Sequence, residues 1–140
     1  MIGADGVLRG PAGNGAVAPV AQDDVAAVAT AVLRSDRYDG ETLDVTGPDR
    51  VTMADVVSLL AELTGRRIRY VDETVEEAYA SRSSYDAAPF EVDGWVSTYT
   101  AIAASELDVV SPVVKMVTGR DPVSLRALLE GRPDLWQHLA

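Results

Sequence analysis

The feature that most constrains the fold is an alternation of helix and strand patterns between residues 17 and 71. A short, β-branched apolar run at Thr42–Thr46 has the length and composition of a strand buried in a parallel sheet. A helix opened by aspartates precedes this run, and a helix with its N-cap at Thr52 follows it. A second apolar run, Arg67–Val71, comes after that helix. Helix, strand, helix and strand at this spacing predict an α/β fold.

Both helices have one apolar face and recognisable ends. In the first, apolar residues recur at the spacing of a single helix face, namely Val25, Val28, Ala29, Val32 and Leu33. Asp23 and Asp24 stand in its first turn, where carboxylates cap free N–H groups and suit the positive end of the helix dipole. The second helix has a capping-box pattern at Thr52 and Asp55, and Gly65 suits the position after its last turn.

The pattern changes near residue 73, from α/β upstream to helical downstream. Further helix starts follow at Thr74, Ser111 and Asp121, and a longer amphipathic helix spans Val92–Leu107. We therefore predict a partial α/β segment at 1–72 and a helical segment at 73–140. The length of 140 residues suits a single domain, so we expect both segments to form one compact unit.

The charge and the scarce residue types exclude several classes of function. A net charge of −10 disfavours binding to phosphate backbones and to anionic membranes. The sequence has no cysteine, which excludes disulfides and thiolate chemistry, and its one histidine, His138, disfavours a histidine-built metal site or triad. No apolar run reaches the roughly 18–20 residues of a membrane helix, and the N-terminus lacks the pattern of a signal peptide. We expect a soluble, cytoplasmic, acidic protein, and the abundance of Ala, Val and Arg over Lys points to a GC-rich bacterial genome.

Two glycine clusters resemble dinucleotide-binding loops without their context. They are Gly3-x-x-Gly6 and Gly10-x-x-Gly13-x-Gly15. A dinucleotide loop needs a strand before its glycines and a helix N-terminus after them to meet the pyrophosphate. Only two residues precede the first cluster, and a turn and a strand pattern follow the second. We interpret both clusters as loops and predict no cofactor-binding residue in this chain.

Acidic pairs and tyrosines provide no catalytic signature. The pairs Asp23-Asp24, Asp72-Glu73 and Glu76-Glu77 stand at helix starts, which explains them better than a metal site or acid/base chemistry does. A Tyr-x-x-x-Lys pair would lower the pKa of a phenol for proton transfer, but no tyrosine here has a lysine four residues on. Lys115 is the only lysine in the chain. We therefore predict no metal site and name no catalytic residue.

Four aromatic residues are the candidates for a small-molecule pocket. Trp95 and Tyr99 lie four residues apart on one helix face, and Tyr79 and Tyr85 are near them in sequence. Aromatic side chains with a polar tip often line such pockets, and they are equally common in an ordinary core. The pattern leaves both interpretations open.

Five segments cover nearly the whole chain with a familiar order of motifs. They are VAPVAQDDVAAVATAVL, GETLDVTGPDRVTMADVVSLLAELTGRRIRYVDET, EEAYASR, VDGWVSTYTAIAASEL and VTGRDPVSLRALL. Together they resemble the second half of NmrA-like proteins. These are atypical short-chain dehydrogenase/reductase proteins related to NAD(P)H:quinone oxidoreductases and NAD(P)H-dependent azoreductases. The aspartate-opened helix, the strand ending in Thr-Gly-Pro, the Thr-capped helix and the late Thr-Gly-Arg carry the resemblance.

The resemblance implies the late portion of a Rossmann-type sheet, with about three short strands, followed by an all-helical C-terminal lobe that covers the substrate cleft. In this family the first half holds NADP or NAD, through a GxxGxxG loop and a basic residue after the second strand. Neither has a counterpart here, so we expect half of such a protein, with no cofactor bound by this chain alone. On the substrate side, the resemblance extends to Tyr79, Trp95 and Tyr99. The whole protein would pass hydride to a quinone- or azo-type acceptor.

Other interpretations remain beside the reductase. The chain would equally suit a non-catalytic NmrA-like regulatory or protein-binding module, or a decayed remnant without activity. In every case a half sheet exposes unpaired N–H and C=O groups at its edge. We therefore predict association through that edge, as a homodimer or with a chain that supplies the other half of the sheet.

Overall fold

The structure is a computed structural model that describes residue 2 and residues 5–140. The chain divides into two compact units, each made of segments distant in sequence. The larger unit contains Met1–Val17, Val51–Asp108 and Asp134–Ala140, and the smaller unit contains Ala18–Arg50 and Val109–Pro133. These bounds differ from the predicted division between residues 72 and 73, because each unit is held together by contacts between segments far apart along the chain.

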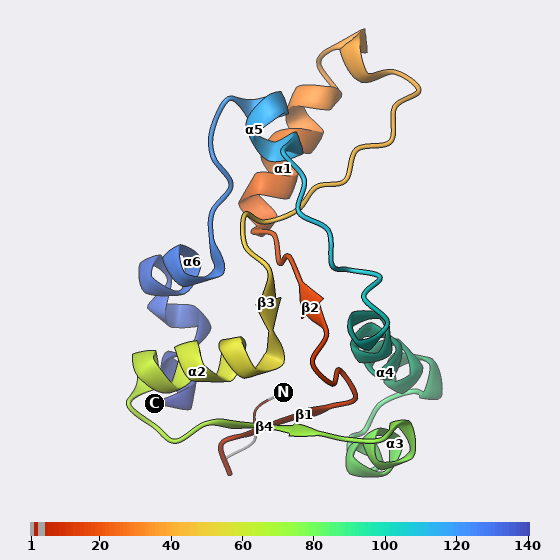
Figure 1. Cartoon of the computed structure of the whole chain (residues 1–140), viewed down its shortest axis with the longest axis vertical. Helices are drawn as coiled ribbons and strands as arrows, with labels where there is room; N and C mark the ends of the chain where they lie inside the picture. The colour runs from red at the N-terminus through yellow and green to blue at the C-terminus, as the bar shows by residue number, and fades with distance from the viewer. Residues whose placement is uncertain (1, 3–4) are drawn as a thin grey trace. The chain divides into compact units, whose positions relative to one another are not determined.

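The larger unit contains two small sheets of two strands each. Strand β1 (Val7–Gly10) pairs in parallel with β4 (Arg69–Asp72), and the two lie side by side in Figure 1. Strand β2 (Ala16–Val17) pairs antiparallel with β3 (Val51–Thr52). The strand after the second helix was predicted, as was a strand pattern after the second glycine cluster, and the fold class is α/β as expected.

The larger unit has three α-helices in its described residues, of which the first two begin and end where the sequence indicates, while the third begins and ends a few residues before the predicted Val92–Leu107. They are α2 (Met53–Thr64), α3 (Val75–Arg82) and α4 (Pro89–Ala103). The predicted capping boxes at Thr52 and Thr74 are both formed, with Asp55 and Glu77 as their partners. Gly65 ends α2 in the left-handed conformation, at φ 69°, which glycine adopts without a steric cost. Two short 3-10 helices, η2 (Pro133–Leu135) and η3 (Gln137–Leu139), close the chain.

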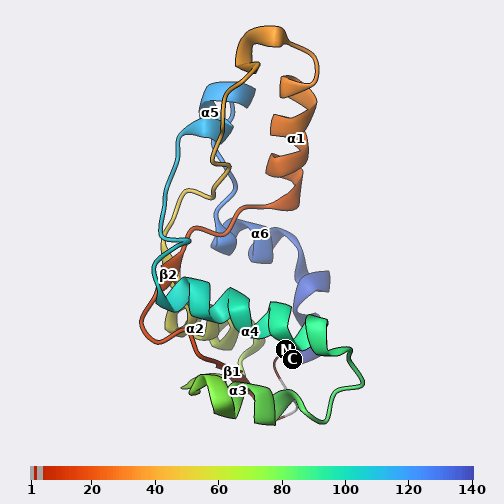
Figure 2. The ribbon, with the colours of Figure 1, turned by 90° about the vertical axis from the view of Figure 1, so that its right-hand side faces the viewer.

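The smaller unit is helical and packs on a core of valines. Its helices are α1 (Gln22–Val32), the 3-10 helix η1 (Asp36–Tyr38), α5 (Val113–Thr118) and α6 (Leu125–Gly131). Helices α1 and α5 lie side by side in both ribbon views (Figures 1 and 2). Val28, Val113 and Val114 form their buried contact, and Val32, Leu43, Val45 and Val117 pack around it. The apolar stripe predicted for the first helix therefore supplies this core.

Two sequence-based predictions are wrong in the smaller unit. The predicted strand at Thr42–Thr46 is present as an extended segment without a ladder partner among the described residues. Its Leu43 and Val45 pack on the core, as the apolar pattern predicts. A β-strand, however, also requires hydrogen bonds to a neighbouring strand. The last helix was expected to open at Asp121 and instead begins at Leu125, with the hydroxyl of Ser124 as its N-cap.

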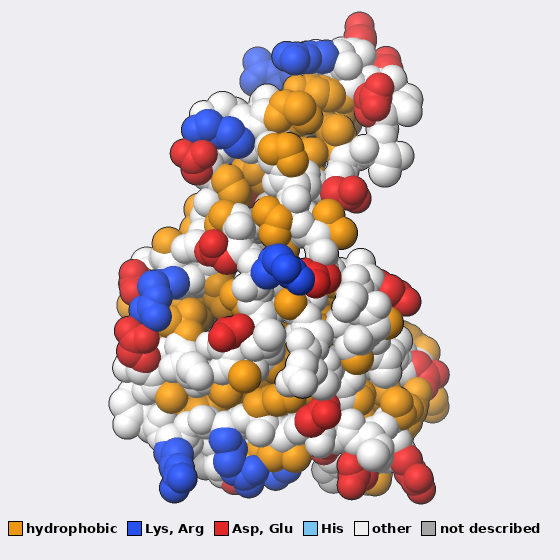
Figure 3. Space-filling view, in the orientation of Figure 1, with side chains coloured by type: hydrophobic (Ala, Val, Ile, Leu, Met, Phe, Trp, Pro, Cys, Tyr) orange, Lys and Arg blue, Asp and Glu red, His pale blue; other side chains and the backbone are white. Residues whose placement is uncertain are grey.

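The surface carries charges of both signs. The view of Figure 3 shows Lys and Arg side chains gathered at its lower edge, over the segment that leads into β4. Arg67 and Arg69 are exposed there and alternate with the buried Ile68, as the strand pattern predicts. Within the described residues, we find no helix that combines the length and the apolar character needed to cross a membrane.

Candidate functional site

A pocket of about 280 Å³ lies in the larger unit between the end of α3 and one face of α4. Its lining is formed by Arg82, Tyr85, Trp95, Thr98 and Tyr99. Helices α3 and α4 are neighbours, as Figure 2 shows. Two of the three predicted substrate-side residues, Trp95 and Tyr99, therefore line the same cavity. Arg82, Tyr85 and Thr98 form the rest of its lining.

The local sequence explains why α4 presents this face. Pro89 stands at the first helical position, where its missing N–H costs nothing, and Glu91 accepts a hydrogen bond from the Ala88 amide at 2.8 Å. From there, Trp95, Thr98 and Tyr99 recur at i, i+3 and i+4, which places them on one side of the helix. The hydroxyl of Thr98 donates to the carbonyl of Gly94 at 2.9 Å and thus turns back onto the helix.

The aromatic rings are held in defined positions. The rings of Tyr85 and Trp95 make an edge-to-face contact, with centroids 6.1 Å apart and planes inclined by 72°. This is a favourable arrangement for aromatic pairs. On the other side, the ring of Tyr99 lies so close to Gly10 that a Cβ there would come within 2.5 Å of its Cδ1. Strand β1 therefore needs a glycine at this point to admit the ring.

Arg82 joins the pocket to the buried interior of the unit. Its side chain and that of Glu73 are 8% and 7% exposed, and they form an ion pair at 3.1 Å. The guanidinium also donates to the carbonyls of Ala78 at 2.8 Å and Arg9 at 3.0 Å. Its Cζ lies 5.6 Å from the centroid of the Tyr99 ring, which is a cation–π distance. Multiple acceptors of this kind are what a buried guanidinium requires.

Tyr99 keeps its phenolic proton at neutral pH. Burial raises its pKa above the ordinary value, the nearby Glu73 carboxylate raises it further, and only the Arg82 guanidinium opposes the rise. A phenol with a raised pKa donates hydrogen bonds and does not serve as a phenolate base. This agrees with the lack of a lysine partner in the sequence, and it makes Tyr99 a wall and a donor in the pocket.

Tyr79, the third predicted residue, is not among those that line this pocket. It stands on α3, is 41% exposed, and its hydroxyl donates to Asp93 of α4 at 3.0 Å. This hydrogen bond is the main reason why its pKa is raised. The bond ties the two helices that flank the pocket. That Tyr79, Trp95 and Tyr99 contact a substrate stays a prediction.

Sequence reasoning missed Arg82 because its partners are not local. One signal in the sequence pointed to Arg82. It stands in the last turn of a short helix whose capping box begins at Thr74, directly after Glu73. An arginine and a glutamate nine residues apart do not share a helix face, however. Only the return of the chain at the start of α3 brings them together.

The glycine turn after β1 bonds to its own unit. The amide of Ala12 donates to the Tyr70 hydroxyl at 2.9 Å, and the amide of Gly13 donates to Asp72 Oδ1 at 2.8 Å. The amide of Gly15 donates back to the Ala12 carbonyl at 3.0 Å. These N–H groups are occupied, so this turn does not fit the pyrophosphate of a dinucleotide. The first glycine of the other cluster, Gly3, lies outside the described residues.

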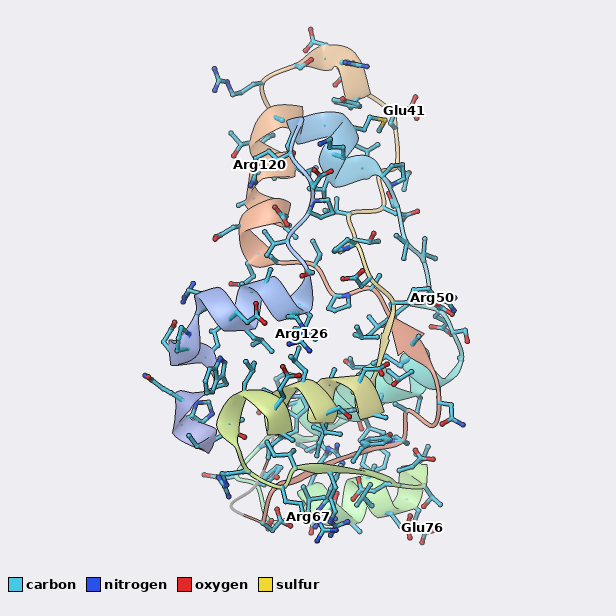
Figure 4. All side chains as sticks on the ribbon, turned by 60° about the vertical axis from the view of Figure 1, so that its left-hand side comes forward. Glu41, Arg50, Arg67, Glu76, Arg120 and Arg126 are labelled. Carbon is cyan, nitrogen blue, oxygen red and sulfur yellow. The ribbon has the colours of Figure 1, made fainter. Side chains whose placement is uncertain are left out.

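Asp24 has a different role from the predicted helix cap. Helix α1 has no side-chain cap, and Asp24 is fully buried. Its Oδ2 accepts a hydrogen bond from the Val123 amide at 2.7 Å, and its Oδ1 pairs with Arg120 at 3.2 Å. Arg120 lies beside α1 in Figure 4. The carboxylate thus tethers the segment between α5 and α6 to α1, and the capping prediction is wrong for this residue. The described residues contain no cluster of three or more metal-ligating side chains.

Comparison with known proteins relates this chain to a group of reductases. No family model matches it. An NAD(P)H azoreductase from Xenophilus azovorans is 31% identical over 110 residues, which are 79% of this chain and 38% of that protein. An NmrA-like family domain-containing oxidoreductase from Aspergillus flavus is 26% identical over 136 residues, which are 90% of this chain and 44% of that protein.

A solved structure agrees with these relatives at the level of the fold. The NADPH-dependent quinone oxidoreductase of Escherichia coli, in its complex with NADPH, matches with a TM-score of 0.85 at 20% identity. The match covers 91% of this chain and 45% of that chain. The fold of this chain is therefore α/β and matches part of the fold of that structure. More particularly, the chain is related to the NmrA-like, NAD(P)H-dependent oxidoreductases, as its motifs indicate, and it spans less than half the length of these relatives.

Proposed function

We propose that this chain forms the substrate-binding part of an NAD(P)H-dependent NmrA-like oxidoreductase that reduces a quinone- or azo-type acceptor. The observation that carries the proposal is the pocket with Tyr85, Trp95 and Tyr99 in its walls. Flat aromatic walls of this kind suit a planar conjugated acceptor, which gains contact area by lying against them. The relatives are an azoreductase and an NmrA-like oxidoreductase, which supports a redox function.

The cofactor, NADP or NAD, belongs in this proposal to the part of the protein that this chain does not cover. The glycine turn does not fit it, since the amides of Ala12 and Gly13 already donate to Tyr70 and Asp72. We therefore expect that this chain alone binds no nicotinamide cofactor. When bound, the cofactor supplies the hydride, and the residues of this chain hold and orient the acceptor.

Two titrations of the isolated chain test the proposal. With NADPH, we expect no saturable change in the fluorescence of the cofactor, and saturable binding would overturn the assignment of the cofactor to the other part. With a planar acceptor such as 1,4-naphthoquinone, we expect quenching of Trp95 fluorescence. Trp136→Phe, which removes the only other tryptophan, should preserve that quenching, and Trp95→Phe should abolish it. If naphthoquinone binds to neither variant nor to the wild type, the pocket is not an acceptor site.

A second candidate is a non-catalytic NmrA-like regulatory or protein-binding module. The occupied amides of the glycine turn suit it, because they make this turn structural and leave it without free donors for a cofactor. The two candidates differ in turnover. In a protein that joins this chain to a cofactor-binding half, NADPH oxidation that depends on naphthoquinone supports the reductase, and NADPH binding without oxidation supports the regulatory module.

We further propose that the chain pairs through the extended segment Thr42–Thr46, as a homodimer or with a chain that supplies the other half of the sheet. Its Leu43 and Val45 pack on the core of the smaller unit, and Thr46 Oγ1 accepts a hydrogen bond from the Ser111 amide at 2.8 Å. Among the described residues, no ladder partner joins the segment. Exposed main-chain groups of this kind accept a neighbouring strand. A clean monomer at micromolar concentration in analytical ultracentrifugation would contradict self-association.

Asp44→Pro is the matched variant for this pairing, because Asp44 is exposed and proline removes an amide donor in the middle of the segment. Asp49→Pro, in the same exposed loop but outside the segment, serves as control. We expect Asp44→Pro alone to shift the sedimentation toward the monomer.

A further inference from the structure

The hydrogen bonds of Arg82 do not use all of its donors. A guanidinium has five N–H groups. Nη1 donates to Glu73 at 3.1 Å, to the Ala78 carbonyl at 2.8 Å and to Ser81 at 3.1 Å, and Nη2 donates to the Arg9 carbonyl at 3.0 Å. Nε has no acceptor among the described residues. The guanidinium is therefore fixed through both terminal nitrogens, and its Nε–H group is left for another acceptor.

The Nε–H group of Arg82 is not sealed from solvent. Among the described residues, no side-chain nitrogen or oxygen is both sealed from solvent and without a partner. The Nε–H group consequently has access to solvent, although the side chain is only 8% exposed. Arg82 is also one of the residues that line the aromatic pocket, and we infer that a ligand in this pocket reaches the Nε–H group. A charged donor that is held rigidly at the wall of an apolar pocket is a typical device for orienting a ligand.

The charge around Arg82 decides what kind of acceptor group suits it. Glu73 already neutralises the guanidinium within the buried pair, and the whole chain carries a net charge of −10. A carboxylate or sulfonate would bring an additional negative charge next to Glu73, at a desolvation cost that no second cation offsets. A carbonyl oxygen accepts the same hydrogen bond without that cost. The walls, meanwhile, favour a flat ring.

We propose that Arg82 is the specificity-determining residue of the pocket, donating its Nε–H to the carbonyl oxygen of a planar, uncharged aromatic ligand that lies against Trp95 and Tyr99. The inference rests on the proposed function, in which this pocket receives the acceptor, and it adds the class of acceptor and the group that recognises it. Arg82 positions the ring by its oxygen. The ion pair with Glu73 and the bond to the Arg9 carbonyl hold the guanidinium in place for this purpose.

The first test compares three probes that share one ring system, by calorimetric titration of the wild-type chain. We expect 1,4-naphthoquinone to bind about tenfold more tightly than naphthalene, because its carbonyl oxygen gains one hydrogen bond from a charged donor. Ionised 1-naphthoate should bind no more tightly than naphthoquinone. Equal binding of naphthoquinone and naphthalene, or tighter binding of naphthoate, would overturn the inference. If none of the three binds, the proposed function itself fails, which separates the two outcomes.

The second test uses variants of the donors. In Arg82→Met combined with Glu73→Gln, which leaves no unpaired buried charge, the preference for naphthoquinone over naphthalene should fall about tenfold, to near unity. Arg69→Met is the matched control, since it removes an exposed arginine of the same unit that does not line the pocket. Its preference should match the wild type, and an equal fall in this variant would contradict the role of Arg82.

A spectroscopic measurement keeps the proposal testable if the double variant does not fold. In the wild-type chain, the ¹⁵Nε resonance of Arg82 should shift on addition of naphthoquinone and stay in place on addition of naphthalene. A purely structural arginine would respond to both probes alike or to neither, and either result contradicts the assignment.

Discussion

The two units each bury one carboxylate with an arginine, and they do so differently. In the larger unit, Glu73 and Arg82 are both buried, at 7% and 8% exposure. In the smaller unit, Asp24 is fully buried while the Arg120 side chain is 53% exposed. The second carboxylate relies on a main-chain amide, that of Val123, at least as much as on its arginine. A fully buried pair is costly to build. The larger unit therefore contains a buried ion pair, at an energetic cost, beside its pocket. In the smaller unit, the buried carboxylate instead links α1 to the segment between α5 and α6.

The largest effect is expected from breaking the fully buried pair. Arg82→Met leaves Glu73 as a buried charge without its cation, so the free energy of unfolding in urea should fall by about 3–5 kcal/mol. Adding Glu73→Gln should recover most of this loss, since the charge is then gone. Arg9→Met, which removes a partly exposed arginine paired with Asp5, is the control and should cost less than about 1 kcal/mol. An equal loss in Arg82→Met and Arg9→Met would refute the distinction.

Breaking the tether of the smaller unit should cost less. Asp24→Ala leaves the Val123 amide without its acceptor, whereas the half-exposed Arg120 can return to water. We expect a loss of about 2–3 kcal/mol in urea unfolding. Asp23→Ala changes the neighbouring, exposed aspartate and should stay within about 0.5 kcal/mol. Similar losses at both positions would mean that the first-turn charge matters and the tether does not.

The phenol of Tyr70, on β4 of the larger unit, provides a pH-dependent test. Tyr70 donates to the Gly10 carbonyl and accepts from the Ala12 amide, and burial is the main reason why its pKa rises to about 12. A raised pKa means that the neutral phenol is favoured in the folded state. Its contribution is complete below the ordinary pKa near 10 and is lost as the pH rises toward 12. Unfolding measured across this window should show a decline in stability that is shallower in Tyr70→Phe. Identical slopes would exclude Tyr70 as the cause.

The smallest effect concerns helix caps, which also differ between the units. Helix α2 of the larger unit has a capping box, whereas α1 of the smaller unit has no side-chain cap. Thr52→Ala should cost about 1 kcal/mol. The pKa of Asp55 is lowered by hydrogen bonds from the backbone and then the side chain of Thr52, so it should rise partway toward its ordinary value in this variant. Carbon NMR of the Asp55 carboxyl measures the shift, and an unchanged pKa would show that the side-chain bond has no influence.

Much of the fold could be predicted because its signals are local. The capping boxes at Thr52 and Thr74 involve residues three positions apart, and the left-handed Gly65 depends on the conformation of a single residue. The apolar stripe of α1 requires only the helical repeat. Trp95 and Tyr99 were placed together for the same reason, since they share one helix face and now line one pocket.

The remaining parts of the site depend on contacts between distant residues. Arg82 bonds to the Arg9 carbonyl across 73 positions, and Asp24 bonds to the Val123 amide across 99. No pattern within a helix or strand encodes such partners. Asp23 and Asp24 were predicted together as helix caps. In the structure Asp24 is buried and bonds to a distant segment, whereas Asp23 is exposed.

The run Thr42–Thr46 lies in the middle of the region that first indicated an α/β fold. It shows which properties the local sequence determines and which depend on the tertiary structure. Its β-branched residues set an extended backbone, and its alternation directs Leu43 and Val45 into the valine core. Both are properties of the residues themselves. A β-ladder requires the N–H and C=O groups of a second strand. In the tertiary structure β1 and β4 lie side by side and pair, whereas among the described residues no strand pairs with Thr42–Thr46. Local chemistry decided the caps and the apolar faces of the helices, and long-range packing decided the strand pairs, the buried ion pairs and the pocket.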